Sequence, residues 1–239
     1  MRAAIDWART TLLARTPDEF GPSAVRFLLH ECTHLQDAAL RDATEQGLTH
    51  ALGWARHDPD TWRRIEWIRL LDLASVLSDD DRLRQASTGA LPDAVDALEH
   101  AVRSRYEPGD GLMGRSPLEH LRCASALLAA FDLTGRLPYS MLAEELLRAA
   151  RHQTWDPRTG SFDSVASTSV GLSVSCHLAR LHADADYAAR VPAAPGTDER
   201  TLARQMSAFV AAHASTCPDT AGEVGLALVE WFALESDLQ

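Results

Sequence analysis

The segment from His30 to His34 has the residue types and the spacing of a metal-dependent hydrolase motif. It reads His-Glu-Cys-Thr-His, so on a helix the two histidines lie one turn apart on the same face. Two such imidazoles can bind Zn²⁺, and Glu31 between them can act as a general base toward a metal-bound water. The sequence therefore predicts His30 and His34 as candidate metal ligands, and zinc is the one cofactor that it suggests.

The residues around this motif differ from those of zinc proteases. Cys32 follows the glutamate where zincins prefer a large apolar residue, and Asp37 stands where metzincins have a glycine. The β-sheet that precedes a zincin helix has no support in the sequence. Three interpretations therefore remain: a zinc hydrolase, a metal site completed by an acid from a neighbouring helix, and a structural role for Glu31 and His34.

A polar pattern that includes this motif recurs on three predicted helices. It places an acid, a basic group and a small polar or acidic group at positions i, i+3 and i+6. The copies are Glu31-His34-Asp37, Glu66-Arg69-Asp72 and Glu119-Arg122-Ser125. Because residues three apart share a helical face, each copy forms a stripe along its helix. The stripes are interpreted either as exposed, salt-bridged faces or as the lining of a shared polar interior.

The second interpretation predicts a pocket in which these charged groups do chemistry. Histidine is a natural general acid or base near neutral pH, and His177 lies on a further helix of the same kind. The candidate catalytic residues are His34, Glu66, Arg69, Glu119, Arg122 and His177. For each histidine the alternative is a structural role, because a lone histidine on a helix commonly has one.

The elements that must position these residues are helices. The chain has only three isoleucines and is rich in Leu and Ala, so strand-forming residues are scarce. Apolar residues recur at helical spacing in a first set of segments, 24–40, 63–77, 117–131, 167–181 and 223–234. A second set alternates with it, at 43–57, 91–106, 141–155 and 199–213. We expect one all-α domain, residues 1–239, built from about four to five antiparallel helical hairpins.

Proline-marked corners end the helices of the second set. The corners are His57-Asp58-Pro59, Tyr106-Glu107-Pro108, Trp155-Asp156-Pro157 and, more loosely, Thr216-Cys217-Pro218. Proline stops a helix and favours an extended conformation in the residue before it. Successive prolines of the first three corners are 49 residues apart, and the fourth follows after 61. A period near 49 with one insertion, assigned to the VPAAPGTDE loop, is typical of stacked helical hairpins.

The stretch SPLEHLRCASALLAAFDLTGRLPYSMLAEELLRAARHQTWDPRTGSF resembles one hairpin of the α/α toroid. Terpenoid cyclases and prenyltransferases have this architecture, as do six-hairpin carbohydrate-active families that include N-acylglucosamine 2-epimerases. The resemblance covers about one repeat in detail. It implies an incomplete or open ring, with substrate bound at the mouth of the inner helices, here the first set. The D-x-D-D motif of protonating cyclases is replaced by Ser78-Asp79-Asp80-Asp81.

The composition excludes several classes of function. With 34 acidic and 23 basic side chains the net charge is −11, which disfavours nucleic acid as a partner. All the basic side chains are arginines, so neither a Schiff-base lysine nor a P-loop lysine is present. The chain has no signal-like start and no long uncharged apolar run, and its four cysteines form no C-x-x-C pair. We expect a cytoplasmic protein without a membrane span, from a GC-rich bacterial genome.

The leading hypothesis for the function is a pocket, lined by the first set of helices, that binds or transforms a small molecule, either a carbohydrate or an isoprenoid. One alternative is a metal-dependent hydrolase centred on His30, Glu31 and His34. The other is a non-catalytic helical scaffold for a protein partner. Whether the Glu-x-x-Arg/His faces point inward to one cavity distinguishes the first hypothesis from the other two.

Overall fold

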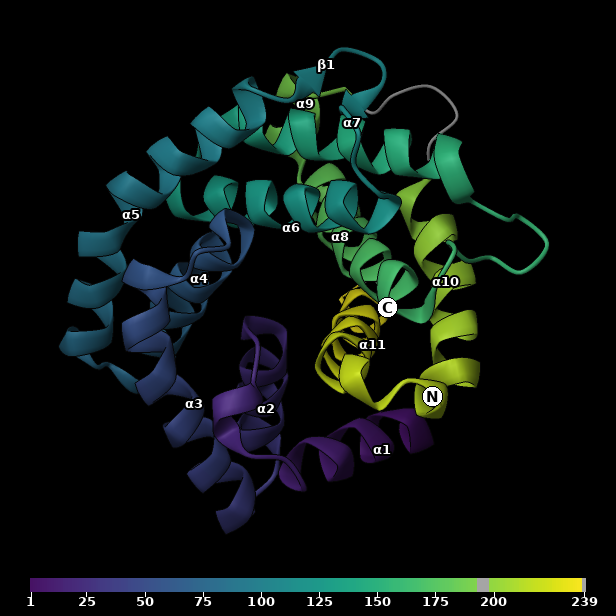
Figure 1. The fold of residues 1–239 in the computed structure, drawn as a ribbon. Helices are drawn as coiled ribbons and strands as arrows, with labels where there is room; N and C mark the ends of the chain where they lie inside the picture. Colours follow the sequence, from purple (N-terminus) through teal and green to yellow (C-terminus); the bar gives the residue numbers. More distant parts are fainter. Residues whose placement is uncertain (193–197, 238–239) are drawn as a thin grey trace.

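The computed structural model describes residues 1–192 and 198–237, and the chain in these ranges is almost entirely helical (Figure 1). The only strands there are β1 (Tyr106–Glu107) and β2 (Gly111–Leu112), which pair antiparallel in a small hairpin. The prediction of an all-α fold is therefore confirmed. Residues 193–197, within the segment to which the insertion is assigned, lie outside the described residues.

Five helices stand around the middle of the molecule and form an inner ring (Figure 1). They are α2 (Pro22–His34), α4 (Thr61–Ser78), α6 (Pro117–Thr134), α8 (Val165–Ala183) and α11 (Ala221–Ser236). Each contacts the next, and α11 contacts α2, so the contacts run all the way round. These helices correspond to the first set of segments, although the segment 24–40 spans the end of α2 and the start of α3.

The second set of segments forms an outer layer around the ring (Figure 1). Its helices are α3 (Ala38–His57), α5 (Asp81–Arg103), α7 (Leu137–Thr154) and α10 (Glu199–His213). Helix α3 packs mainly on α2 and α4, and α5 packs on α4. Helix α7 packs on α6, and α10 packs on α8. The short helix α9 (Ala185–Arg190) intervenes between α8 and α10, where the repeat is longest. The likeness to the α/α-toroid superfamily stays a prediction, because it concerns family membership.

The first helix of the chain completes the outer layer by packing on the last. Helix α1 (Arg2–Leu13) lies against α11, a pairing that the sequence did not predict. Helix α11 in turn fits closely against α2. A Cβ added at Gly225 would lie 2.8 Å from the ring of Phe27, so this approach requires a residue without a side chain. The N-terminal and C-terminal helices thus close the ring together.

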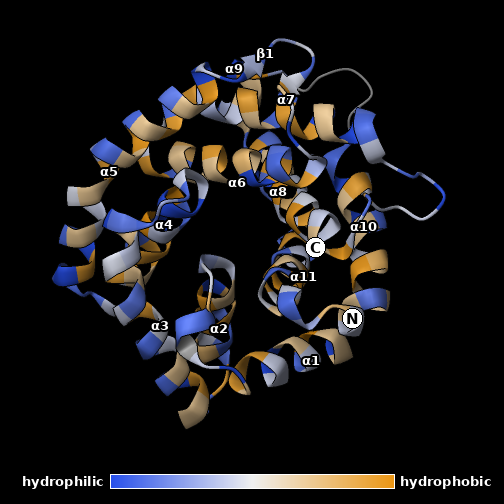
Figure 2. Cartoon of the chain, in the orientation of Figure 1, coloured by the Kyte–Doolittle hydropathy of each residue, from blue (hydrophilic) through white to orange (hydrophobic). Residues whose placement is uncertain are grey.

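The core lies between the two layers. Helix α5 buries Leu83, Ala90, Ala94 and Leu98 against its neighbours, and this spacing of seven, four and four residues marks one helical face. Figure 2 shows hydrophobic colour on the side of α5 that faces the ring and hydrophilic colour on the opposite side. None of the described helices combines the length and apolar character that crossing a membrane requires.

The corners between the layers are held by buried polar groups. Asp58 of the first corner accepts hydrogen bonds from Trp67 Nε1 and Arg63 Nη2, both at 3.1 Å. At the second corner the backbone N–H of Leu112 donates to His120 Nε2 at 2.9 Å. His120 therefore joins the β-hairpin to α6 and has a structural role. The predicted helix 91–106 is longer than expected at its start, because α5 continues through Pro92.

Candidate functional site

A cavity of about 280 Å³ opens at the end of the inner ring where its helices begin. We call it the mouth cavity. All five inner helices line it with residues from their N-terminal halves, and α1 closes one side. Its charged lining includes Arg15, Arg63, Glu66, Arg122 and Glu223. Because backbone N–H groups are exposed at helix N-termini, five converging helix starts favour a bound anion or polar ligand here.

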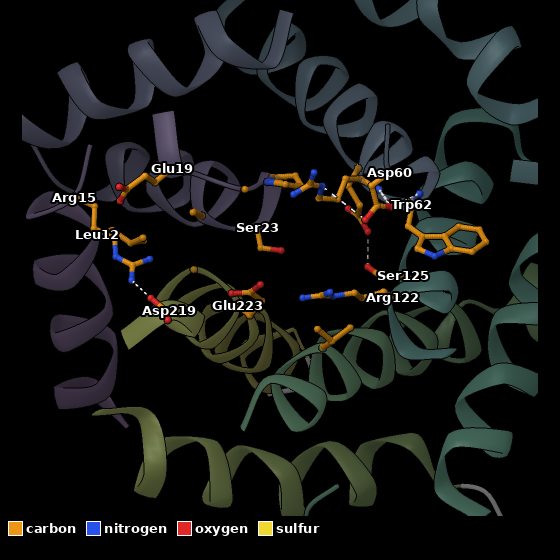
Figure 3. Close-up of a pocket in the computed structure, with 17 residues that line it drawn as sticks. Leu12, Arg15, Glu19, Ser23, Asp60, Trp62, Arg122, Ser125, Asp219 and Glu223 are labelled. Carbon is orange, nitrogen blue, oxygen red and sulfur yellow. Dashed lines mark hydrogen bonds and ion pairs between the residues drawn. The ribbon is translucent and has the colours of Figure 1, made fainter. Parts of the chain in front are cut away.

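Three charged side chains that line the mouth cavity have no partner among the described residues, namely Glu19, Arg122 and Glu223. Figure 3 shows Arg122 of α6 and Glu223 of α11 pointing toward each other across the cavity. Neither forms an ion pair or a hydrogen bond with another side chain in the part of the chain that the structure describes. Burial raises the pKa of Glu223, and the charges of Arg122 and Arg15 offset this only in part. Such a carboxyl group is a candidate proton donor or acceptor.

Glu66 of α4, another charged group that lines this cavity, is held by two contacts. Its carboxylate accepts a hydrogen bond from the hydroxyl of Ser125 (Figure 3) and lies 3.5 Å from Arg26 Nη1. The other terminal nitrogen of Arg26 donates to Glu230 at 2.8 Å. A continuous set of polar contacts therefore crosses the ring from α6 through α4 and α2 to α11.

A second group of contacts lies deeper in the ring. Arg69 Nη2 is 2.7 Å from one oxygen of Asp132, and His177 Nε2 is 3.0 Å from the other. Burial alone would raise the pKa of Asp132, but the hydrogen bond from His177 and the charge of Arg69 outweigh it, and the pKa lies below its usual range. We call Arg26, Glu66, Arg69, Asp132, His177 and Glu230 the central ion network.

The buried carboxylate of Glu230 shows the same balance as Asp132. Burial would raise its pKa, but the charges of Arg26 and Arg69 lower it further, so the group stays ionised inside the ring. In the central ion network each charged group is thus paired with an opposite charge, although Nε of Arg26 and Oε2 of Glu230 form no hydrogen bond.

The predicted site residues fall into three places. Glu66, Arg69 and His177 meet in the central ion network, and Arg122 lies in the mouth cavity. Glu119 instead forms a capping box with Ser116 at the start of α6 and pairs with Arg115. It lies at the rim, where it stabilises a helix end.

The third place lies outside the ring, where His30, Glu31 and His34 face α1. Arg9 Nε donates to Glu31 at 2.9 Å, so this copy of the polar pattern does not reach the central ion network. The two imidazoles pack edge to face, with ring centroids 4.6 Å apart. They line a cavity of about 670 Å³ between α1, α2 and α11.

The geometry around this histidine pair offers no complete ligand set. Within the described residues, no third His, Cys, Asp or Glu brings a ligand atom close to those of both His30 and His34. Burial and the neighbouring His34 also lower the pKa of His30. A metal at this pair stays a prediction, and the structure adds no third ligand to it.

Sequence reasoning missed Arg26, Asp132, Glu223 and Glu230. The polar pattern could not reveal them, because each stands outside its i, i+3, i+6 spacing. A different signal was present: Arg26, Asp132 and Glu230 are isolated charges within apolar helical runs. A charge in such a run is buried, and a buried charge requires a partner on a neighbouring element.

The arrangement at the mouth can bind an anion through Arg122 and exchange a proton through Glu223. The carboxylate of Glu66, fixed by Arg26 and Ser125, offers an acceptor for a ligand hydroxyl group. The site therefore combines charge recognition, hydrogen bonding and a titratable group in one cavity. Compared with known proteins, the chain matches no family model and no curated sequence.

Proposed function

We propose that the chain binds and transforms a small carbohydrate that carries an anionic group, such as a sugar acid, in the mouth cavity. The observation that carries the proposal is the pair of unpartnered groups, the exposed Arg122 and the half-buried Glu223, that face each other there. A protein that kept these charges only for stability would pair them, as the central ion network does. Free opposing charges in a cavity are instead typical of a ligand site.

The size and the lining of the mouth cavity favour a sugar over an isoprenoid. Ligand pockets for drug-sized molecules usually measure about 300–1,000 Å³, and this cavity lies near the lower limit of that range. Charged and hydroxyl-bearing side chains surround it, and these would lose hydration against a hydrocarbon chain.

The proposed chemistry is general acid–base catalysis on a bound sugar acid. The planar guanidinium of Arg122 binds the carboxylate of the ligand through two parallel hydrogen bonds. Glu223 then donates a proton to the sugar or accepts one from it, since burial keeps its protonated form populated at higher pH than in an exposed carboxyl. Glu66 orients a ligand hydroxyl group.

Calorimetric titration with sugars that differ in charge tests the binding step. D-glucuronate, D-gluconate and glucose 6-phosphate are the anionic probes, and D-glucose is the uncharged control. We expect at least one anionic probe to bind and Arg122→Gln to weaken it more than tenfold, which corresponds to loss of about 1.4 kcal/mol. Arg204→Gln, at an exposed position on α10, is the matched control. Equal affinity in Arg122→Gln and the wild type would refute the proposed role of Arg122.

The proton-transfer step is tested separately by NMR in deuterated water. The bound probe should exchange a carbon-bound hydrogen with solvent or be converted to a product, and Glu223→Gln should stop this while the probe still binds. Retention of the full rate in Glu223→Gln would remove Glu223 from the mechanism. Binding without exchange or product for every bound probe would reduce the site to a binding site.

A further inference from the structure

A second cluster of titratable side chains lies away from the mouth cavity, where α7, α8 and α10 meet. Glu144 comes from α7, His182 from the end of α8, and Glu199 is the first residue of α10. One ligand atom from each of the three lies within 4.8 Å of the other two. Across residues 1–192 and 198–237 no other three His, Cys, Asp or Glu residues meet this condition.

The two carboxylates of this cluster are buried, and their charges are only partly compensated. Glu144 is 6% exposed and Glu199 is 7% exposed. Arg148 Nη2 approaches one oxygen of Glu144 at 3.1 Å, which leaves the second oxygen directed to the cluster. Glu199 forms no salt bridge with any other described residue. Two buried carboxylates side by side are unfavourable unless a cation joins them.

The imidazole of His182 is unusual because it lacks hydrogen bonds. Its side chain is 11% exposed, and both ring nitrogens are buried without a hydrogen-bond partner. An imidazole normally uses one nitrogen as donor and the other as acceptor, so two nitrogens without a partner in a largely buried ring each carry a desolvation penalty. A structural histidine avoids this penalty, as His120 does through its two backbone contacts.

The separation between the ligand atoms of His182 and Glu144 fits a tetrahedral cation. Nε2 of His182 lies 3.4 Å from Oε2 of Glu144, and zinc with bonds near 2.1 Å holds its ligand atoms about 3.4 Å apart. Tyr187 packs edge-on against the imidazole, with ring centroids 5.3 Å apart, and fixes its orientation.

We propose that Glu144, His182 and Glu199 bind one divalent transition-metal ion, with zinc as the best fit. The two carboxylates balance the charge of the ion, and the imidazole supplies the nitrogen that zinc prefers over calcium or magnesium. The ion joins three helices, α7 of one hairpin and the pair α8 and α10 that follows it. Because the cluster shares no lining residue with the mouth cavity, the metal stabilises the fold and takes no part in the chemistry there.

Titration of the full-length chain, purified without a tag and stripped with a chelator, tests the site. We expect calorimetry with ZnCl₂ to give one ion per chain, and Co²⁺ to give the intense visible absorption of tetrahedral coordination. His182→Gln and Glu199→Gln should each weaken zinc binding at least tenfold and remove the cobalt spectrum. The double variant His30→Gln/His34→Gln is the control, because it removes the other histidine pair and should bind zinc as the wild type does.

Thermal unfolding distinguishes a loss of zinc binding from a loss of folding in the variants. Zinc should raise the Tm of the wild type in proportion to the logarithm of its concentration, and it should leave the Tm of Glu199→Gln unchanged. Without metal, Glu199→Gln should be at least as stable as the wild type, since the uncompensated carboxylate is gone. The proposal would be overturned if the folded wild type did not bind zinc. It would also be overturned if zinc raised the Tm of His182→Gln and Glu199→Gln but not that of His30→Gln/His34→Gln.

Discussion

The mouth cavity and the central ion network are built from the same five helices, within a few turns of each other. They differ in whether their charged side chains form ion pairs. In the central ion network every charged group has a partner, for example Asp132 between Arg69 and His177. In the mouth cavity Arg122 and Glu223 face each other without contact. Charges that form ion pairs across a ring of helices therefore stabilise the fold. Charges that face each other without forming ion pairs leave a site for a ligand.

The two regions differ in the sign of their pKa shifts for the same reason. Asp132 and Glu230 have lowered pKa values because neighbouring positive charges outweigh burial. Glu223 has a raised pKa because burial outweighs its more distant arginines. Stability should accordingly depend on these groups in opposite directions.

Replacing Glu230 with alanine should cause the largest loss of stability. Removing Glu230 breaks the shorter of the two ion pairs of Arg26 and leaves its charge opposed only by Glu66 at 3.5 Å, and breaking a buried pair typically costs about 3–5 kcal/mol. Urea unfolding monitored by circular dichroism measures the loss. Glu235→Ala, on the same helix in a more exposed pair with Arg200, should cost less than about 1 kcal/mol. Equal losses in the two variants would mean that the central ion network has no special role.

Asp132→Asn should lower stability by about 2 kcal/mol at neutral pH, since hydrogen bonds to a charged group are lost. The folded pKa of Asp132 is lowered, so its contribution is fully present above the unfolded pKa of about 3.9 and is lost as pH falls through the folded value. The difference between wild type and variant should therefore shrink below about pH 4. Unfolding curves at several pH values test this, and a constant difference down to pH 2 would contradict it.

Glu223→Gln should have the opposite effect and raise the Tm at pH 7. The raised pKa means that the folded state favours the protonated carboxyl, so its stabilising contribution is fully present below the unfolded pKa of about 4.3 and is lost as pH rises through the folded value. Each kcal/mol gained corresponds to roughly 2–4 °C for a domain of this size. Differential scanning fluorimetry should show the gain vanish near pH 4. A lower Tm at neutral pH would show that Glu223 stabilises the fold.

Glu119→Gln should have the smallest effect of the series. Glutamine at this position still closes the capping box with Ser116, and the lost pair with Arg115 is a surface contact, so stability should change by less than about 0.5 kcal/mol. Affinity for an anionic sugar should be unchanged, unlike that of Arg122→Gln one turn away. A tenfold loss of that affinity with the stability intact would return Glu119 to the site, where the sequence pattern had placed it.

The helices and their alternation were predictable because they follow from local signals. Apolar periodicity marked the inner and outer helices, and proline marked the corners, so the two layers could be recognised segment by segment. The pairing of α1 with α11 had no such signal. It depends on surfaces at opposite ends of the chain, and periodicity within each helix says nothing about its partner.

The candidate site was predictable only in part, because spacing along a helix does not fix depth within a ring. Glu31 and Glu66 occupy the same place in the polar pattern, but Glu31 lies nearer the end of its helix and binds Arg9 of the outer layer. Glu223 stands alone at the start of α11. Its chemistry arises from burial opposite Arg122, which only the packed structure specifies.

The closure of the ring by α1 and α11 has a consequence for the order of folding. Hairpins such as α6 with α7 join residues close in sequence, whereas Arg15 with Asp219 and Arg26 with Glu230 join residues 204 positions apart. Closing so long a loop is slow, so we expect the hairpins to assemble first and the ends to meet last. The mouth cavity lies where the two ends of the chain meet, since Arg15, Asp219 and Glu223 all line it. A ligand there would bind only the completed ring and would slow the separation of the chain ends during unfolding.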